Sequence, residues 1–142
     1  MRKLYHVPKT GAEVLIVDEP TAGLDPGERN RFYDLISDVG QDVIVILSTH
    51  IVDDVRELCT SMAVLNHGSI VFNGTPDEGI HELEGRVFEK KIERSELEKY
   101  TQNYNVISNR LIGGKPVIHV LGEKPDEDFS AIAPSLEDVF FS

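Results

Sequence analysis

Two short apolar runs, each followed at once by polar residues, dominate the first half of the chain. Residues 14–17 are Val-Leu-Ile-Val and precede two acidic residues, and residues 43–47 are Val-Ile-Val-Ile-Leu and precede Ser-Thr-His. Uninterrupted apolar runs of this length are typical of strands that are buried on both faces in a parallel sheet. We therefore predict strands over residues 13–19 and 42–47.

The segments between and after these strands show the periodicity of helices. Apolar residues at three- and four-residue spacing predict a helix over residues 26–37, which Gly40 ends. A shorter helix is expected over residues 51–58. It carries Asp53 and Asp54 in its first turn, and we interpret this pair as acidic residues favoured by the positive end of the helix dipole.

The second half of the chain is predicted to consist of short strands and brief helices. Asn66-His67-Gly68 and Gly113-Gly114 are typical of hairpin turns, and Thr75 and Ser135 of helix N-caps. The expected elements are strands 62–65 and 69–72, a helix after Thr75, a strand over 86–92, a helix over 95–100, strands 104–112 and 116–121, and a helix after Ser135. The predicted fold class is α/β, with parallel strands and helices first and a small α+β region after residue 84.

Asp18 and Glu19 directly follow the first apolar run. Ligands of parallel sheets bind at the carboxyl ends of the strands, so this pair is expected at a ligand-binding edge. Asp18 can hold Mg²⁺ directly or through water, and Glu19 can orient or deprotonate an attacking water. The alternative is that both acids are ordinary strand-end residues that cap a turn.

A longer pattern surrounds these acids. Residues 14–26 read Val-Leu-Ile-Val-Asp-Glu-Pro-Thr-Ala-Gly-Leu-Asp-Pro. This stretch resembles the Walker B motif and D-loop of the ABC ATPases, the nucleotide-binding subunits of ABC transporters. Residues 43–50 resemble the next core strand of that family and its switch histidine. The resemblance implies that residues 1–84 form the C-terminal half of an ABC ATPase core, a partial P-loop NTPase fold.

The resemblance also implies roles for four residues. Asp18 is similar to the aspartate that holds Mg²⁺ through water, and Glu19 to the catalytic glutamate. His50 corresponds to the histidine that contacts the γ-phosphate of ATP, and Asp25 to the D-loop residue that ties the site to the opposite subunit. ATP and Mg²⁺ are the implied cofactors. Read alone, His50 is a structural strand-end residue and Asp25 forms an Asp-Pro turn.

The end of the chain carries a second resemblance. Residues 134–140, Pro-Ser-Leu-Glu-Asp-Val-Phe, and the elements before them resemble the accessory C-terminal region of exporter-type ABC ATPases, such as drug and antibiotic efflux subunits. This implies an accessory region over residues 85–142. The resemblance to the ABC ATPase family as a whole implies a second ATPase subunit in a head-to-tail dimer, a transmembrane permease partner, and a cytoplasmic location at the inner face of the cell membrane.

Three motifs of such an ATPase, the phosphate-binding loop, the glutamine loop and the signature, are missing from the 142 residues. No phosphate-binding loop of the form G-x-x-x-x-G-K-[ST] occurs, because the only similar letters, Gly113-Gly114-Lys115-Pro116, stand in another order. The signature L-S-G-G-Q is also absent. We therefore expect the C-terminal part of a longer subunit, inactive by itself. The alternatives are a non-catalytic regulatory or dimerisation module and a non-transport ABC ATPase of the chromosome-maintenance or DNA-repair type.

Composition narrows these alternatives. The net charge of −11 argues against binding to nucleic acid or to anionic lipid through a basic patch. No apolar run is long enough for a membrane span, and the single cysteine permits no internal disulfide. The histidines outside the resemblance show no metal-ligand spacing, so we predict surface or turn positions for them: His6, His67, His81 and His119.

Overall fold

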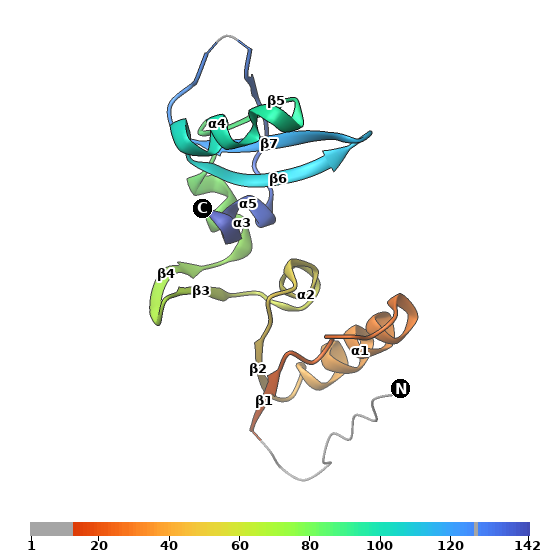
Figure 1. Cartoon of the computed structure of the whole chain (residues 1–142). Coiled ribbons are helices and arrows are strands. Elements are labelled where there is room, and N and C mark those ends of the chain that lie inside the picture. The colour runs from red at the N-terminus through yellow and green to blue at the C-terminus, as the bar shows by residue number, and fades with distance from the viewer. Residues whose placement is uncertain (1–12, 127) are drawn as a thin grey trace. The chain divides into compact units, whose positions relative to one another are not determined.

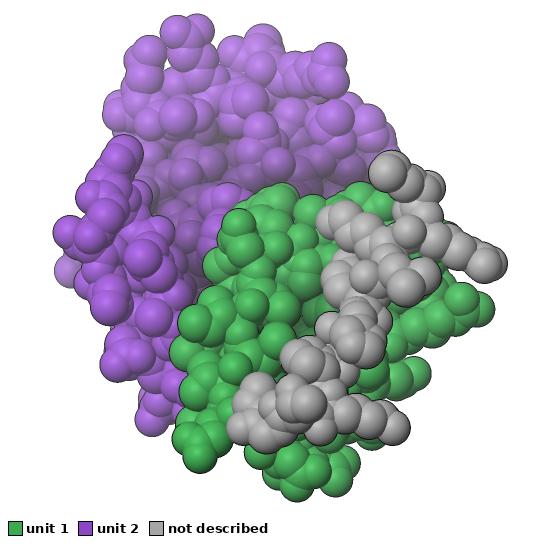
Figure 2. All heavy atoms as spheres, turned by 90° about the horizontal axis from the view of Figure 1, so that it is seen from below, with its two compact units in different colours: residues 1–58 green, residues 59–142 purple. Residues whose placement is uncertain are grey.

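The structure is a computed structural model that describes residues 13–126 and 128–142, in two compact units (Figure 2). Unit 1 comprises residues 1–58 and unit 2 residues 59–142. The architecture is mixed α/β, as predicted (Figure 1). The predicted boundary after residue 84, between an ATPase core and an accessory region, remains a prediction. Unit 1 contains β1 (Val14–Asp18), α1 (Pro26–Val39), β2 (Ile44–Ser48) and α2 (Val52–Leu58).

The two strands of unit 1 pair in parallel, with Asp18 opposite Ser48 at their carboxyl ends. Both strands and both helices lie where the sequence predicts them. On one face of the pair, Leu15 and Val45 pack against a cluster of apolar residues from α1 and the loop before it. The cluster consists of Leu24, Phe32 and Ile36.

The prediction that both strands are buried on both faces is wrong. Ile16 is 72% exposed and Ile44 is 64% exposed, and Val14 and Ile46 are exposed as well. The reason is that burial alternates along each strand, and only the face toward α1 is covered. A two-layer arrangement can bury only one side of a sheet.

Unit 2 consists of a hairpin, a four-stranded sheet and short helices. In chain order they are β3 (Met62–Asn66), β4 (Ser69–Gly74), α3 (Pro76–Glu82), β5 (Val87–Lys91), η1 (Arg94–Glu96), α4 (Leu97–Asn103), β6 (Val106–Ile112), β7 (Lys115–Leu121), β8 (Ser130–Ala131) and α5 (Leu136–Phe141). The sheet order is β6-β7-β5-β8, and every pairing is antiparallel. Both predicted hairpin turns are present, since His67, Gly68, Gly113 and Gly114 have positive φ.

The core of unit 2 lies on the four-stranded sheet. Its buried members are Phe88, Ile92, Ile118, Val120 and Phe129, and Tyr100 and Tyr104 pack against them. The predicted helix over residues 95–100 begins instead with the 3-10 turn η1, in which the Glu96 N–H donates to the Glu93 carbonyl at 3.0 Å. Strand β8 was not predicted, since two residues give no recognisable period.

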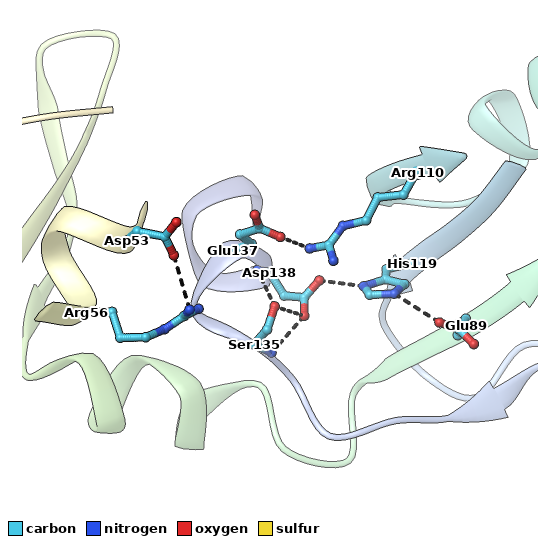
Figure 3. Close-up of polar contacts among 8 residues, drawn as sticks. All are labelled: Asp53, Arg56, Glu89, Arg110, His119, Ser135, Glu137 and Asp138. Carbon is cyan, nitrogen blue, oxygen red and sulfur yellow. Dashed lines mark hydrogen bonds and ion pairs between the residues drawn. The ribbon is translucent and has the colours of Figure 1, made fainter. Parts of the chain in front are cut away.

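The surface position predicted for His119 is wrong. This residue lies on β7 and is 8% exposed. Its Nδ1–H donates to Asp138 Oδ1 at 2.7 Å, and its Nε2 lies 3.3 Å from Glu89 Oε2 (Figure 3). Two carboxylates from other elements therefore enclose the ring. His67 and His81 lie in the turn and surface positions predicted for them, and His6 is outside the described residues.

Candidate functional site

The carboxyl ends of β1 and β2 bring polar side chains together in unit 1. Ser48 Oγ donates a hydrogen bond to Asp18 Oδ1, because the parallel register places these two residues side by side. Glu19 follows immediately, and its N–H donates to the Ser48 carbonyl at 2.8 Å. The acids predicted to lie at the sheet edge therefore lie there.

The backbone of Glu19 turns sharply at this edge. Its φ of 44° lies in the left-handed region, which is uncommon for a residue other than glycine. Such a conformation costs on the order of 1 kcal/mol or more and persists only where neighbouring contacts hold it. The bonds from Glu19 N–H to Ser48 and from Ala22 N–H to the Glu19 carbonyl, at 3.3 Å, are two such contacts.

Glu19 and His50 form a close pair. Glu19 Oε2 lies 2.8 Å from His50 Nδ1. The pair is within ion-pair distance, although its angles are not those of a hydrogen bond. The Oε2 atom is shielded from solvent, whereas the His50 side chain is 70% exposed. The structure thus joins the two side chains that the sequence assigns to catalysis, and leaves the histidine open to a ligand.

Asp25 has a local task. It is the N-cap of α1, and its Oδ1 accepts a hydrogen bond from the Glu28 N–H at 2.8 Å. Pro26 occupies the first helical turn, where its missing N–H costs nothing. Among the described residues, no hydrogen bond or ion pair joins Asp25 to Asp18, Glu19 or His50. Its assignment to a subunit contact stays a prediction.

One residue of this region was misread in the sequence. Asp54, interpreted as a dipole-favoured acid, is completely buried. Its carboxylate accepts three hydroxyl hydrogen bonds, from Thr21 at 2.6 Å, Thr49 at 2.8 Å and Tyr33 at 2.8 Å. Burial, with the hydrogen bond to Asp54, raises the pKa of Tyr33 above its usual value. A signal was available, because Asp54 shares a helix face with Leu58, which packs against the core.

The donor set at the sheet edge suits a hydrated magnesium ion. Mg²⁺ in nucleotide sites keeps several waters and takes one or two carboxylates together with phosphate oxygens. Asp18 is exposed and can supply one such carboxylate. The described residues contain no group of three or more His, Cys, Asp or Glu side chains that could hold a metal ion by themselves. Phosphate oxygens of a nucleotide, together with waters, would complete the shell of a Mg²⁺ ion that Asp18 holds.

Comparison with known proteins gives relatives for about half of the chain. The energy-coupling factor transporter ATP-binding protein EcfA2 of Clostridioides difficile is 52% identical over 68 residues, 46% of this chain and 24% of that protein. A putative ABC transporter ATP-binding protein of Methanosarcina acetivorans is 43% identical over 68 residues, 46% and 21% of the two chains. About half of this chain is homologous to ABC transporter ATP-binding proteins. No protein-family model matches the chain.

A third relative supports the same homology. A putative ABC transporter ATP-binding protein of Mycoplasma pneumoniae is 40% identical over 76 residues, 52% of this chain and 22% of that protein. The chain thus spans about a quarter or less of the length of these curated relatives. None of the three names specifies an exporter. Within the part of the chain that the structure describes, no helix has both the length and the hydropathy needed to cross a membrane.

Proposed function

We propose that this chain works within an ATP-binding, ATP-hydrolysing subunit of an ABC transporter and supplies the carboxylate edge of its nucleotide site. The observation that carries the proposal is the Glu19–His50 pair, 2.8 Å apart, beside Asp18 at the carboxyl edge of a parallel strand pair. Homology to ABC transporter ATP-binding proteins over about half of the chain supports it.

Each residue of the edge has a proposed role. Glu19 orients and polarises the water that attacks the γ-phosphate, a task suited to a carboxylate held by a fixed neighbour. His50, largely exposed, contacts the γ-phosphate and holds the Glu19 carboxylate in place. Asp18 holds the hydrated Mg²⁺, which would neutralise charge on the phosphates. Asp25 lies in the loop proposed to contact the opposite subunit.

The same proposal assigns the missing parts to other sequence. Phosphates need a cradle of backbone N–H groups and a lysine, and the 142 residues hold no such loop. Nucleotide binding therefore requires a phosphate-binding loop from outside them. A second ATPase subunit and a transmembrane permease complete the proposed assembly at the cytoplasmic face of the cell membrane. We assign residues 1–84 to the ATPase core and 85–142 to an accessory region. Export as the direction of transport rests only on the resemblance of residues 134–140.

A chimera tests the proposal. The matching 68-residue stretch of the Clostridioides difficile protein is replaced by that of this chain, and Mg²⁺-dependent ATP hydrolysis is measured against the parent. We expect hydrolysis by the chimera and a loss of about a hundredfold or more on Glu19→Gln, the usual size of a general-base contribution. Nucleotide binding should be retained.

The matched control is Glu13→Gln, an exposed acid just before β1 that should leave hydrolysis unchanged. Normal turnover in the Glu19→Gln chimera would remove Glu19 from its role. A folded chimera without hydrolysis, beside an active parent, would favour the non-catalytic regulatory or dimerisation module.

A further inference from the structure

A single buried carboxylate joins the two loops that carry Glu19 and His50. Asp54 Oδ2 accepts hydrogen bonds from Thr21 Oγ1 at 2.6 Å and from Thr49 Oγ1 at 2.8 Å. Thr21 lies two residues after Glu19, and Thr49 directly precedes His50. One oxygen atom thus fixes the loop after β1 relative to the loop after β2.

The remaining contacts make this junction rigid. Asp54 Oδ1 accepts a hydrogen bond from the Tyr33 hydroxyl at 2.8 Å, which links the junction to α1. Thr49 Oγ1 also accepts a hydrogen bond from the Ile51 N–H at 3.0 Å. A buried carboxylate is tolerated only when donors replace its lost hydration, and charge-assisted bonds of this kind are the stronger ones. Burial of Asp54 is therefore favourable only while Thr21 and Thr49 keep their hydroxyl groups in place, which restrains both loops.

We propose that Asp54 is a positioning residue that holds Glu19 against His50. The left-handed backbone of Glu19 persists only where neighbouring contacts hold it, and Asp54 adds such a contact by holding Thr21, two residues further along. It fixes the approach of His50 through Thr49. An effect of Asp54 on ATP hydrolysis rests on the proposed function, whereas its effect on the positions of Glu19 and His50 does not.

The neighbouring acid provides a matched control. Asp53 precedes Asp54 in α2, is exposed, and forms an ion pair with Arg56 at 3.2 Å (Figure 3). It has the same place near the helix start, so Asp53→Asn removes an acid from the first turn, together with its exposed pair to Arg56, and leaves the bonds of Asp54 intact. Tyr33→Phe is a second control, because it removes the bond to α1 and leaves the bonds to both loops.

The test is nuclear magnetic resonance on the labelled 142-residue chain without nucleotide. The signals are the side-chain ¹⁵N shifts of His50, the carboxyl ¹³C shift of Glu19 and the proton contact between the two side chains, with the turn residue His67 as internal reference. In Asp54→Asn we expect loss of that contact and a shift of the His50 signals to those of His67. Asp53→Asn and Tyr33→Phe should keep the wild-type values.

Unchanged Glu19 and His50 signals in a folded Asp54→Asn chain would overturn the proposal and leave Asp54 a purely stabilising residue. If Asp54→Asn does not fold, Thr49→Val replaces it. This variant keeps the shape of the side chain and the bonds from Thr21 and Tyr33. It should shift the His50 signals, and wild-type signals in it would also overturn the proposal.

Kinetics on the chimera add a second arm. Asp54→Asn should lower kcat about tenfold or more while the KM for ATP changes less than about twofold, because misplaced groups slow chemistry more than they weaken binding. Asp53→Asn should change neither. An inactive wild-type chimera would contradict the proposed function alone, since the resonance experiment decides the positioning role without turnover.

Discussion

Among the described residues, the buried carboxylates of Asp54 and Asp138 accept hydrogen bonds from hydroxyl and imidazole groups rather than from lysine or arginine. Asp54 has three hydroxyl partners, and Asp138, also completely buried, has Ser135 and His119 (Figure 3). Each carboxylate joins elements distant in sequence. Removing either should therefore cost more than removing an exposed acid of the same helix.

Asp138 is expected to be one of the most sensitive positions of unit 2. Asp138→Ala leaves His119 without its buried partner and removes the reciprocal cap of α5. We expect a loss of about 3 kcal/mol in the free energy of unfolding, measured by urea denaturation at neutral pH. The adjacent Glu137→Ala, which breaks an exposed pair with Arg110, should cost less than about 1 kcal/mol. Equal effects of the two would contradict the argument.

The same residue should make stability depend on acid pH. Burial by itself would raise the pKa of Asp138, but the hydrogen bonds from His119 and Ser135 outweigh it and hold the pKa below the usual 3.8. A carboxyl with a lowered pKa in the folded state stabilises the fold above its unfolded pKa. That contribution is lost as the pH falls through the folded value. The difference in stability between wild type and Asp138→Ala should therefore shrink between neutral pH and about pH 3.

Residue roles were predictable where they follow from position along one strand. Asp18 and Glu19 end an apolar run, so their place at the sheet edge could be read directly. Asp54 and His119 were misread, because each has partners far along the chain: Thr21 is 33 residues from Asp54, and Asp138 is 19 residues from His119. Nothing in the local pattern shows which hydroxyl or carboxylate will meet them.

At the level of elements, capping residues in the sequence predict where helices begin. Thr75 and Ser135 cap α3 and α5 as predicted, and the N–H of each capping residue donates in return to the carboxylate of the acid three residues later. Asp25 caps α1 through the bond that its side chain accepts from the Glu28 N–H. The pattern Asp-Pro-x-Glu at residues 25–28 is typical of a helix N-cap. From the sequence, Asp25 was interpreted only as a turn residue or a subunit contact.

Substitutions of Asp25 separate its two roles. Asp25→Ala should lower the stability of unit 1 by about 1 kcal/mol, the usual cost of losing an N-cap, whereas Asp25→Asn keeps an acceptor and should cost little. Circular dichroism during urea unfolding measures both. If Asp25 also contacts an opposite subunit through its charge, Asn should impair hydrolysis by the chimera without impairing stability. Equal loss of stability in both variants would contradict the capping role.

At the level of the whole molecule, the two units have cores of different size. Unit 1 has a small cluster under one face of a strand pair, with Ile16 and Ile44 exposed on the other face. Unit 2 encloses Val87, Ile118 and Val120 almost completely. Since apolar burial is the main source of stability, unit 2 should be the more stable unit.

Hydrogen exchange at increasing denaturant tests this difference. The amides of β5 and β7 should remain protected at urea concentrations where those of β1 and β2 exchange fully, because separate hydrophobic cores can open with different free energies. Mass spectrometry of peptides from each unit gives the two free energies of opening. Identical values for both units would show a single cooperative transition and contradict the division.

Local sequence patterns were enough to predict most strands and helices, both hairpin turns, the caps of α3 and α5, and the acidic pair that ends the first strand, because these depend on residues close together in the chain. Packing of the elements was needed to show that one face of the strands is exposed, that His50 lies 2.8 Å from Glu19, and that Asp54 and His119 are buried. Burial and pairing of this kind depend on which elements pack together. That choice is made by the sum of many apolar contacts across the fold, which no short pattern contains.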